Sequence, residues 1–191
     1  MRFSSWLESV RSRLNASPRR SRQRLRRRTM RGAIEPLESR TLLSVTSLFD
    51  PAAGELSIDS DAAADTIEVS IDAATNEVLV NDLPVDDLAG GTVTADELES
   101  VMIDAGPGND VVDLSALDPV TFSDLVDTEV VITGGDGADV IIGSGMDDVI
   151  QGDAGNDTIN GGRGDDSIHG GQGDDKLNGS AGDDEIYGGA D

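Results

Sequence analysis

The stretch Gly134–Asp191 decides the fold. Written in nines it reads GGDGADVII, GSGMDDVIQ, GDAGNDTIN, GGRGDDSIH, GGQGDDKLN and GSAGDDEIY, followed by GGAD. Position one is Gly in every copy, and position six is Asp in all six full copies. A fixed nine-residue period indicates a repeat architecture, in which each unit buries its apolar residue only against its neighbours.

One repeat is physically simple. Glycine at positions one, two and four lets the backbone adopt positive φ and approach other backbone closely. The three residues after the Asp, such as 158–160, form a short strand with only the middle side chain turned inward. Two repeats then make one coil of turn, strand, turn and strand. Stacked coils align the aliphatic residues of position eight: Ile141, Ile150, Ile159, Ile168, Leu177 and Ile186.

Stacking places alternate repeats above one another, so the aspartates of position six form two columns. One column contains Asp139, Asp157 and Asp175, and the other contains Asp148, Asp166 and Asp184. From residue 134 to the end there are 14 acidic residues against Arg163 and Lys176. Carboxylates in a column repel one another, so the turns require a cation. Without one, an acidic, Gly-rich disordered tail is the alternative.

The atoms that the turns offer as ligands indicate which cation can bind. Calcium takes about six to eight oxygen ligands and combines carboxylates with backbone carbonyls, which Gly-rich turns offer. Magnesium prefers a tight octahedron with retained waters. Zinc requires Cys or His ligands, and the chain has no Cys and one His. An EF-hand is excluded because no Glu closes a twelve-residue loop. The chemistry favours Ca²⁺.

The run resembles the RTX, or haemolysin-type, calcium-binding nonapeptide repeat. The resemblance implies an all-β fold, a right-handed parallel β-roll or β-solenoid, with Ca²⁺ between stacked turns and about four inter-turn sites. It implies that the metal ligands include the position-six carboxylates of Asp139, Asp148, Asp157, Asp166, Asp175 and Asp184. More loosely, it implies turn carbonyls at positions two and four, from Gly135, Gly137, Gly155, Gly162, Gly164, Gly171, Gly173 and Gly182.

Four positions depart from the pattern. Position four of the second repeat is Met146, and position two is Ser144, Asp153 or Ser180 in three copies. A backbone carbonyl can still coordinate from a residue other than Gly. We therefore expect a strained or weaker turn at Met146 and no loss of register.

Residues 1–44 form a basic arm that we expect to be mostly disordered and to act in targeting. Residues 1–40 hold 12 Arg against three Glu, whereas the rest of the chain holds two basic residues against 35 acidic ones. The segment 37–43, LESRTLL, resembles the LEPR-XLL motif of planctomycete surface and secreted proteins, with Ser39 where Pro is usual. A nucleic-acid arm is the alternative, but the acidic remainder would repel phosphate. No apolar run is long enough for a transmembrane span.

Residues 45–133 carry strand patterns without a clean period, at 56–58, 67–71 and 78–80. The segment 105–113 is a degenerate nonapeptide with Asp110 at position six and Val112 at position eight. We expect irregular coils of the same solenoid that cap the β-roll of residues 134–191. A small separate β-sandwich is the alternative.

No catalytic signature is found, so we expect no enzyme. The chain has no HExxH motif and no phosphate-binding loop. The favoured function is a secreted or cell-surface calcium-binding structural protein. The alternatives are an adhesin or matrix module whose partner is a cell-envelope polysaccharide or surface protein, and a fragment of a larger secreted RTX protein or enzyme. The tripeptide Arg163-Gly164-Asp165, a cell-adhesion sequence, occurs inside a repeat, where chance often produces it.

Overall fold

The computed structural model describes residues 45–87, 90–122, 125 and 128–190. The chain divides into two units, Met1–Arg40 and Thr41–Asp191, and all described residues belong to the second. The basic arm, its predicted disorder and the LEPR-XLL-like segment therefore lie outside the described residues. Among the described residues, no helix is long and apolar enough to cross a membrane.

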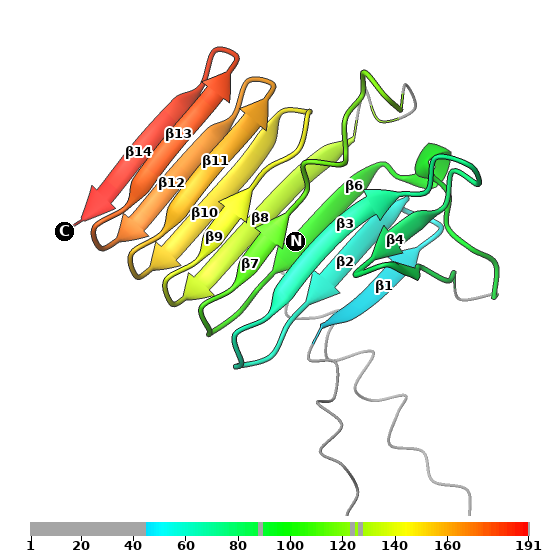
Figure 1. Ribbon diagram of the computed structural model, residues 1–191, viewed down its shortest axis with the longest axis horizontal. Coiled ribbons are helices and arrows are strands. Elements are labelled where there is room, and N and C mark those ends of the chain that lie inside the picture. The colour runs from blue at the N-terminus through cyan, green and yellow to red at the C-terminus, as the bar shows by residue number, and fades with distance from the viewer. Residues whose placement is uncertain (1–44, 88–89, 123–124, 126–127, 191) are drawn as a thin grey trace, which may run out of the picture. The chain divides into compact units, whose positions relative to one another are not determined.

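The second unit is built from two seven-stranded sheets, and from β6 onward successive strands alternate between them (Figure 1). The first sheet has the order β1-β2-β6-β8-β10-β12-β14, and the second has the order β13-β11-β9-β7-β3-β4-β5. The strands are β1 (Thr46–Asp50), β2 (Glu55–Asp59), β3 (Thr66–Ile71), β4 (Val78–Val80), β5 (Leu83–Pro84), β6 (Ser100–Asp104), β7 (Val111–Asp113), β8 (Glu129–Asp136), β9 (Val140–Ile142), β10 (Asp148–Ala154), β11 (Thr158–Arg163), β12 (Ser167–Gln172), β13 (Lys176–Ala181) and β14 (Glu185–Ala190). A 3₁₀ turn, η1 (Ala95–Glu97), precedes β6.

Strands from β6 onward pair in parallel with the strand one coil away. Ile150 pairs with Ile168 in the first sheet, and Ile159 pairs with Leu177 in the second. Both pairs are separated by two nonapeptides, which confirms the predicted coil of two repeats and the parallel β-roll. The ladder of position eight is the core of this region, and its members from Ile141 to Ile168 are buried. Each aliphatic side chain is thus covered by its counterparts in neighbouring coils.

From β10 onward, the strands of the repeats are longer than three residues. β11, β12, β13 and β14 each span six residues, because the first three residues of the following turn continue the parallel ladder. Asp153, for example, pairs with both Gly135 and Gly171. The turn proper is therefore only positions four to six, which holds its backbone closely against the adjacent coils.

Residues 45–133 contribute strands to both sheets. β2 pairs in parallel with β6, and β6 with β8, so Leu56, Val101 and Val130 lie in one row. Antiparallel pairs close this end: β1 with β2, and β4 with both β3 and β5. Phe49 of β1 is buried in the core. These short antiparallel strands occupy the outer positions of both sheets and cover edges that would otherwise offer unpaired backbone.

Candidate metal centre

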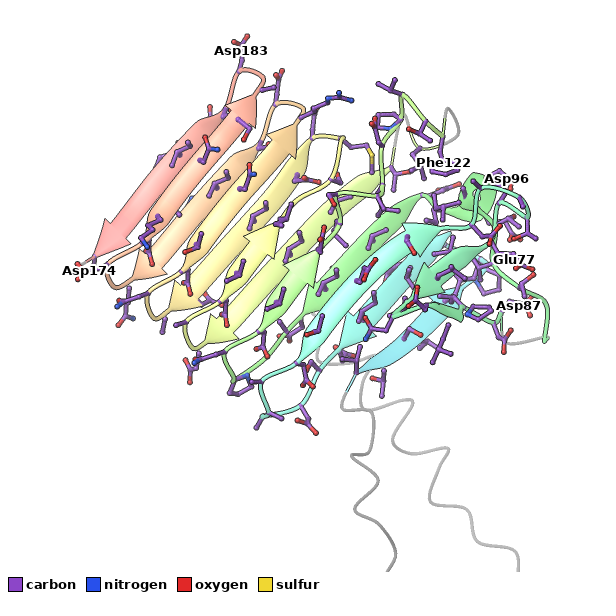
Figure 2. All side chains as sticks on the ribbon, in the orientation of Figure 1. Glu77, Asp87, Asp96, Phe122, Asp174 and Asp183 are labelled. Atoms are coloured by element: carbon purple, nitrogen blue, oxygen red, sulfur yellow. The ribbon has the colours of Figure 1, made fainter. Side chains whose placement is uncertain are left out.

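The turns of the repeats lie at the two edges of the roll, as the opposite positions of Asp174 and Asp183 illustrate (Figure 2). Their glycines adopt the left-handed backbone that the sequence predicts. All eight glycines proposed as carbonyl ligands have positive φ: Gly135, Gly137, Gly155, Gly162, Gly164, Gly171, Gly173 and Gly182. Asp153 and Ser180, at position two, take the same region with φ of 71° and 78°.

Close backbone contacts between coils explain why position four needs glycine. A Cβ atom placed on Gly155 would lie 1.6 Å from the carbonyl oxygen of Gly137, and one on Gly173 would lie 1.9 Å from that of Gly155. The position-four carbonyl oxygen of each of these turns therefore lies close to the α-carbon of the position-four residue one coil later. A column of turn oxygens runs along each edge as a result.

The position-six aspartates hold the turns together through one carboxylate oxygen. Except in Asp148, each Oδ1 accepts a hydrogen bond from the backbone N–H of the aspartate one coil earlier. The bonds measure 2.9 Å from Asp139 to Asp157, 2.9 Å from Asp157 to Asp175, 3.0 Å from Asp148 to Asp166 and 3.1 Å from Asp166 to Asp184. The structure thus brings the six predicted aspartates together in the two predicted columns.

The other carboxylate oxygen is the unusual feature of these turns. Within the described part of the chain, five buried Oδ2 atoms have no hydrogen-bond partner: those of Asp110, Asp139, Asp157, Asp166 and Asp175. In the repeats from residue 134 onward, position-one glycine provides the space for this oxygen, since a Cβ on Gly152 would lie 2.4 Å from Oδ2 of Asp157. A buried anionic oxygen without a partner costs several kcal/mol in principle. The recurrence of this oxygen in both columns indicates that the turns suit a bound cation.

Burial also changes the acidity of these groups. It raises the pKa of Asp157 and of Asp166 to about 6 and that of Asp148 to about 7, with repulsion between neighbouring carboxylates acting in the same direction. The pKa values of Asp110 and Asp139 are raised for the same first reason. Without a counter-ion, burial therefore makes Asp148, Asp157 and Asp166 weaker acids than aspartates exposed to water.

In the second repeat, both carboxylate oxygens of the position-six aspartate, Asp148, have hydrogen-bond donors. The backbone N–H of Ser144 donates to Oδ2 of Asp148 at 2.7 Å, and its hydroxyl donates to Oδ1 at 2.6 Å. Met146 is buried and is not among the residues with positive φ, so the strain predicted at this residue is absent. The predicted register is preserved, because Ile150 still pairs with Ile132.

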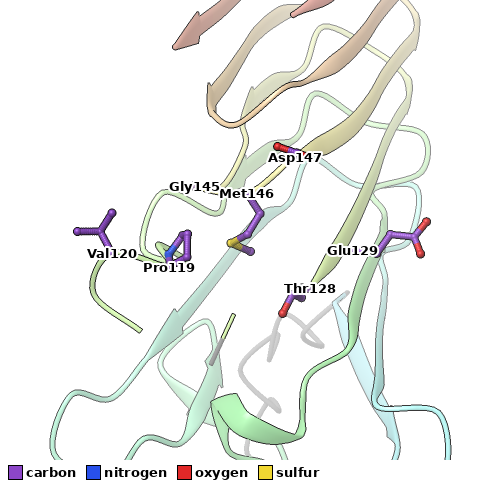
Figure 3. A pocket seen from close by; sticks show the side chains of 7 residues that line it. All are labelled: Pro119, Val120, Thr128, Glu129, Gly145, Met146 and Asp147. Atoms are coloured by element: carbon purple, nitrogen blue, oxygen red, sulfur yellow. The ribbon is translucent and has the colours of Figure 1, made fainter. Parts of the chain in front are cut away.

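The turn of the second repeat packs on the insert that follows β7. The N–H of Gly145 donates to the carbonyl of Leu117 at 2.7 Å. The Met146 side chain lies between Pro119 and Thr128 in a pocket of about 610 Å³ (Figure 3). The side chain that replaces glycine is thus accommodated by a local change of turn.

Arg163 joins the same insert to the fourth repeat, through Nη1 at 3.0 Å from Oδ2 of Asp118. The arginine of the Arg163-Gly164-Asp165 tripeptide therefore forms an ion pair within the protein. Both side chains are solvent-accessible, so we expect Arg163→Ala to change the free energy of unfolding by less than about 1 kcal/mol. Chemical denaturation with calcium present measures this, and Lys176→Ala is a matched control for loss of surface charge. A loss of several kcal/mol in Arg163→Ala alone would contradict the assignment.

The donor set fits a hard cation. Among the described residues, no three acidic, His or Cys side chains converge as a metal cluster. An ion at these turns must therefore combine one or two carboxylates with backbone carbonyls, which is a calcium-type donor set. The unpaired Oδ2 atoms are the side-chain oxygens available to it.

Sequence analysis did not include Asp110 among the site residues. Its N–H donates to Oδ1 of Asp139 at 2.8 Å, so it belongs to the first column. The degenerate copy 105–113 had already placed it at position six. The insert that follows lengthens the interval to Asp139 from 18 to 29 residues and conceals the period.

Comparison with known proteins agrees with this geometry. The family model of the RTX calcium-binding nonapeptide repeat matches residues 133–168 and 160–191. No curated protein and no solved structure gives a significant match to the chain. The nonapeptides of this family bind Ca²⁺. Residues 133–191 thus carry RTX-type calcium-binding nonapeptide repeats.

Proposed function

We propose that the protein is a secreted or cell-surface structural protein whose β-roll folds when Ca²⁺ binds between stacked turns. The ligands are Oδ2 atoms of the position-six aspartates, except Asp148, whose Oδ2 accepts from the Ser144 N–H, together with turn carbonyls at positions two and four. Residues 45–133 act as the N-terminal cap of the roll. Extracellular fluid supplies calcium near the millimolar affinities typical of extracellular modules, which favours folding outside the cell.

The observation that carries the proposal is the row of buried, unpaired Oδ2 atoms in Asp139, Asp157 and Asp175 within the described coils. A bound cation offsets the cost of burying these charges. With dissociation constants of about 10⁻⁴–10⁻³ M, millimolar calcium stabilises each site by roughly 0.5–1.5 kcal/mol. One site is insufficient, whereas several sites in a continuous stack act together.

A calcium titration of the full chain, followed by far-UV circular dichroism, tests the proposal. We expect β-structure to increase cooperatively at sub-millimolar to millimolar Ca²⁺ and to be lost again with a chelator. The same concentrations of Mg²⁺ should have little effect, because Mg²⁺ retains its waters. Asp157→Asn should move the midpoint to higher calcium, because it removes a central ligand.

Asp113→Asn is the matched control, since Asp113 is an acid outside the turns whose Oδ1 accepts from Ser115 N–H, a bond that Asn can also accept. The calcium concentration at the midpoint of its folding transition should equal that of the unmodified chain. A spectrum that is fully β without calcium and unchanged by it would overturn the proposal.

A further inference from the structure

We propose, on the basis of the calcium-dependent folding above, that the first column binds calcium one coil before the matched repeats, with Asp110 as a ligand. The site lies at the turn 105–110, outside residues 133–191. It is assigned from the structure of that turn.

The carboxylate of Asp110 has the environment of those inside the repeats. Its Oδ1 accepts from the N–H of Asp65 at 2.7 Å, and its own N–H donates to Asp139. The side chain is 1% exposed. Its Oδ2 is buried and has no hydrogen-bond partner among the described residues. A buried anionic oxygen of this kind requires a counter-charge.

The backbone around Asp110 also repeats the pattern of the roll. Gly106 has a φ of 73°. A Cβ on Gly135 would lie 2.1 Å from the carbonyl oxygen of Gly106. A Cβ on Gly137 would lie 1.4 Å from the carbonyl of Gly108, close to the 1.6 Å found one coil later at Gly155. The turn 105–110 therefore presents its position-two and position-four carbonyls as the later turns do.

The column stops one coil earlier, at Asp65. There the Ser60 hydroxyl donates to Oδ2 of Asp65 at 2.5 Å, so this oxygen has a partner within its own turn. In the second column, Oδ2 of Asp148, the first aspartate, also has a partner, but its donor is the backbone N–H of Ser144, while the Ser144 hydroxyl donates to Oδ1. A serine residue thus supplies the partner of Oδ2 in the first aspartate of each column. Asp110 has no such serine bond, which makes it the first metal-binding turn of its column.

Calcium stoichiometry of the full chain, measured by equilibrium dialysis with radioactive Ca²⁺ at saturation, tests the proposal. Asp110→Asn keeps the Oδ1 acceptor for Asp65 N–H but replaces the anionic Oδ2. We expect it to bind one ion fewer than the unmodified chain. Asp113→Asn, a charge-matched change on the same coil, should bind the full number. Asp157→Asn should lose binding within the matched repeats.

The outcomes separate the two proposals. If Asp110→Asn binds the full number with unchanged affinity while Asp157→Asn loses ions, the Asp110 site is wrong and calcium-dependent folding stands. If the unmodified chain binds none, the proposed function itself fails.

A second measurement needs no variant and so remains decisive if Asp110→Asn does not fold. Crystals of the unmodified protein grown with calcium should show an anomalous-scattering peak within about 2.3–2.6 Å of Asp110 Oδ2. Peaks at the later turns with none at Asp110 would overturn the inference.

Discussion

Gly155→Ala is expected to abolish the cooperative β-roll even at saturating calcium. Gly155 has a φ of 141°, and the new Cβ would lie 1.6 Å from the carbonyl oxygen of Gly137. Left-handed backbone alone costs about 1–2 kcal/mol for a residue with a Cβ, and displacing packed backbone adds about 1–3 kcal/mol more. The displaced carbonyl belongs to a turn proposed to hold the metal, so calcium binding weakens with the fold. Thermal unfolding with millimolar calcium measures the loss.

Gly188→Ala is the matched control for this prediction. Gly188 has no left-handed φ, and no described atom lies within 4 Å of a Cβ built on it. Its melting temperature should match that of the unmodified chain, with a change in stability within about 0.5 kcal/mol. Equal melting temperatures for Gly155→Ala and Gly188→Ala would show that the coils do not contact one another as described.

The metal-free chain is expected to be more folded at pH 5 than at pH 8. Burial raises the folded-state pKa of Asp157 and Asp166 to about 6 and that of Asp148 to about 7, above the ordinary value of 3.8. Folding therefore takes up protons, and this contribution to stability is fully present below pH 3.8 and lost as pH rises through 6 to 7. Protons replace calcium by neutralising the same carboxylates. Far-UV circular dichroism of calcium-free protein measures the change.

Two controls identify the groups responsible. pH 5 lies above the sequence pI of about 4.1, which keeps the chain negatively charged and limits precipitation. His169→Gln removes the one histidine of the chain and should leave the pH transition in place, because the transition is assigned to the carboxylates. With saturating calcium the order should reverse, because protons compete with the metal. Equal β-content at both pH values without calcium would contradict the raised pKa values.

The repeat sequence predicts the coil because one side chain per nonapeptide decides it. Ile150 and Ile168 could share a row only if two repeats make one turn of the roll, and the register confirms this. The two columns of aspartates follow from the same spacing. The positive φ of Gly155 and Gly173 follows from the absence of a Cβ where the turns need close contact.

Features that depend on single long-range contacts were not predictable in this way. The insert after β7 interrupts the period between Asp110 and Asp139, so only the fold shows that they are neighbours. Met146 was expected to strain its turn, but packing on the insert allows another turn shape. In each example, tertiary context supplied information that the local pattern does not contain.

The burial of the position-eight ladder decreases toward β14. Ile150 and Ile168 are fully buried, Leu177 is partly buried, and Ile186 is 45% exposed. The opposite end is closed by the antiparallel strands around Phe49. In a stack of coils that contact only their neighbours, a coil with one neighbour is less stable than a coil with two. Local unfolding therefore begins at the end that is not covered. Among the described coils, local unfolding should therefore start at β14. We expect amide hydrogen exchange to be fastest in β14 and progressively slower toward β8.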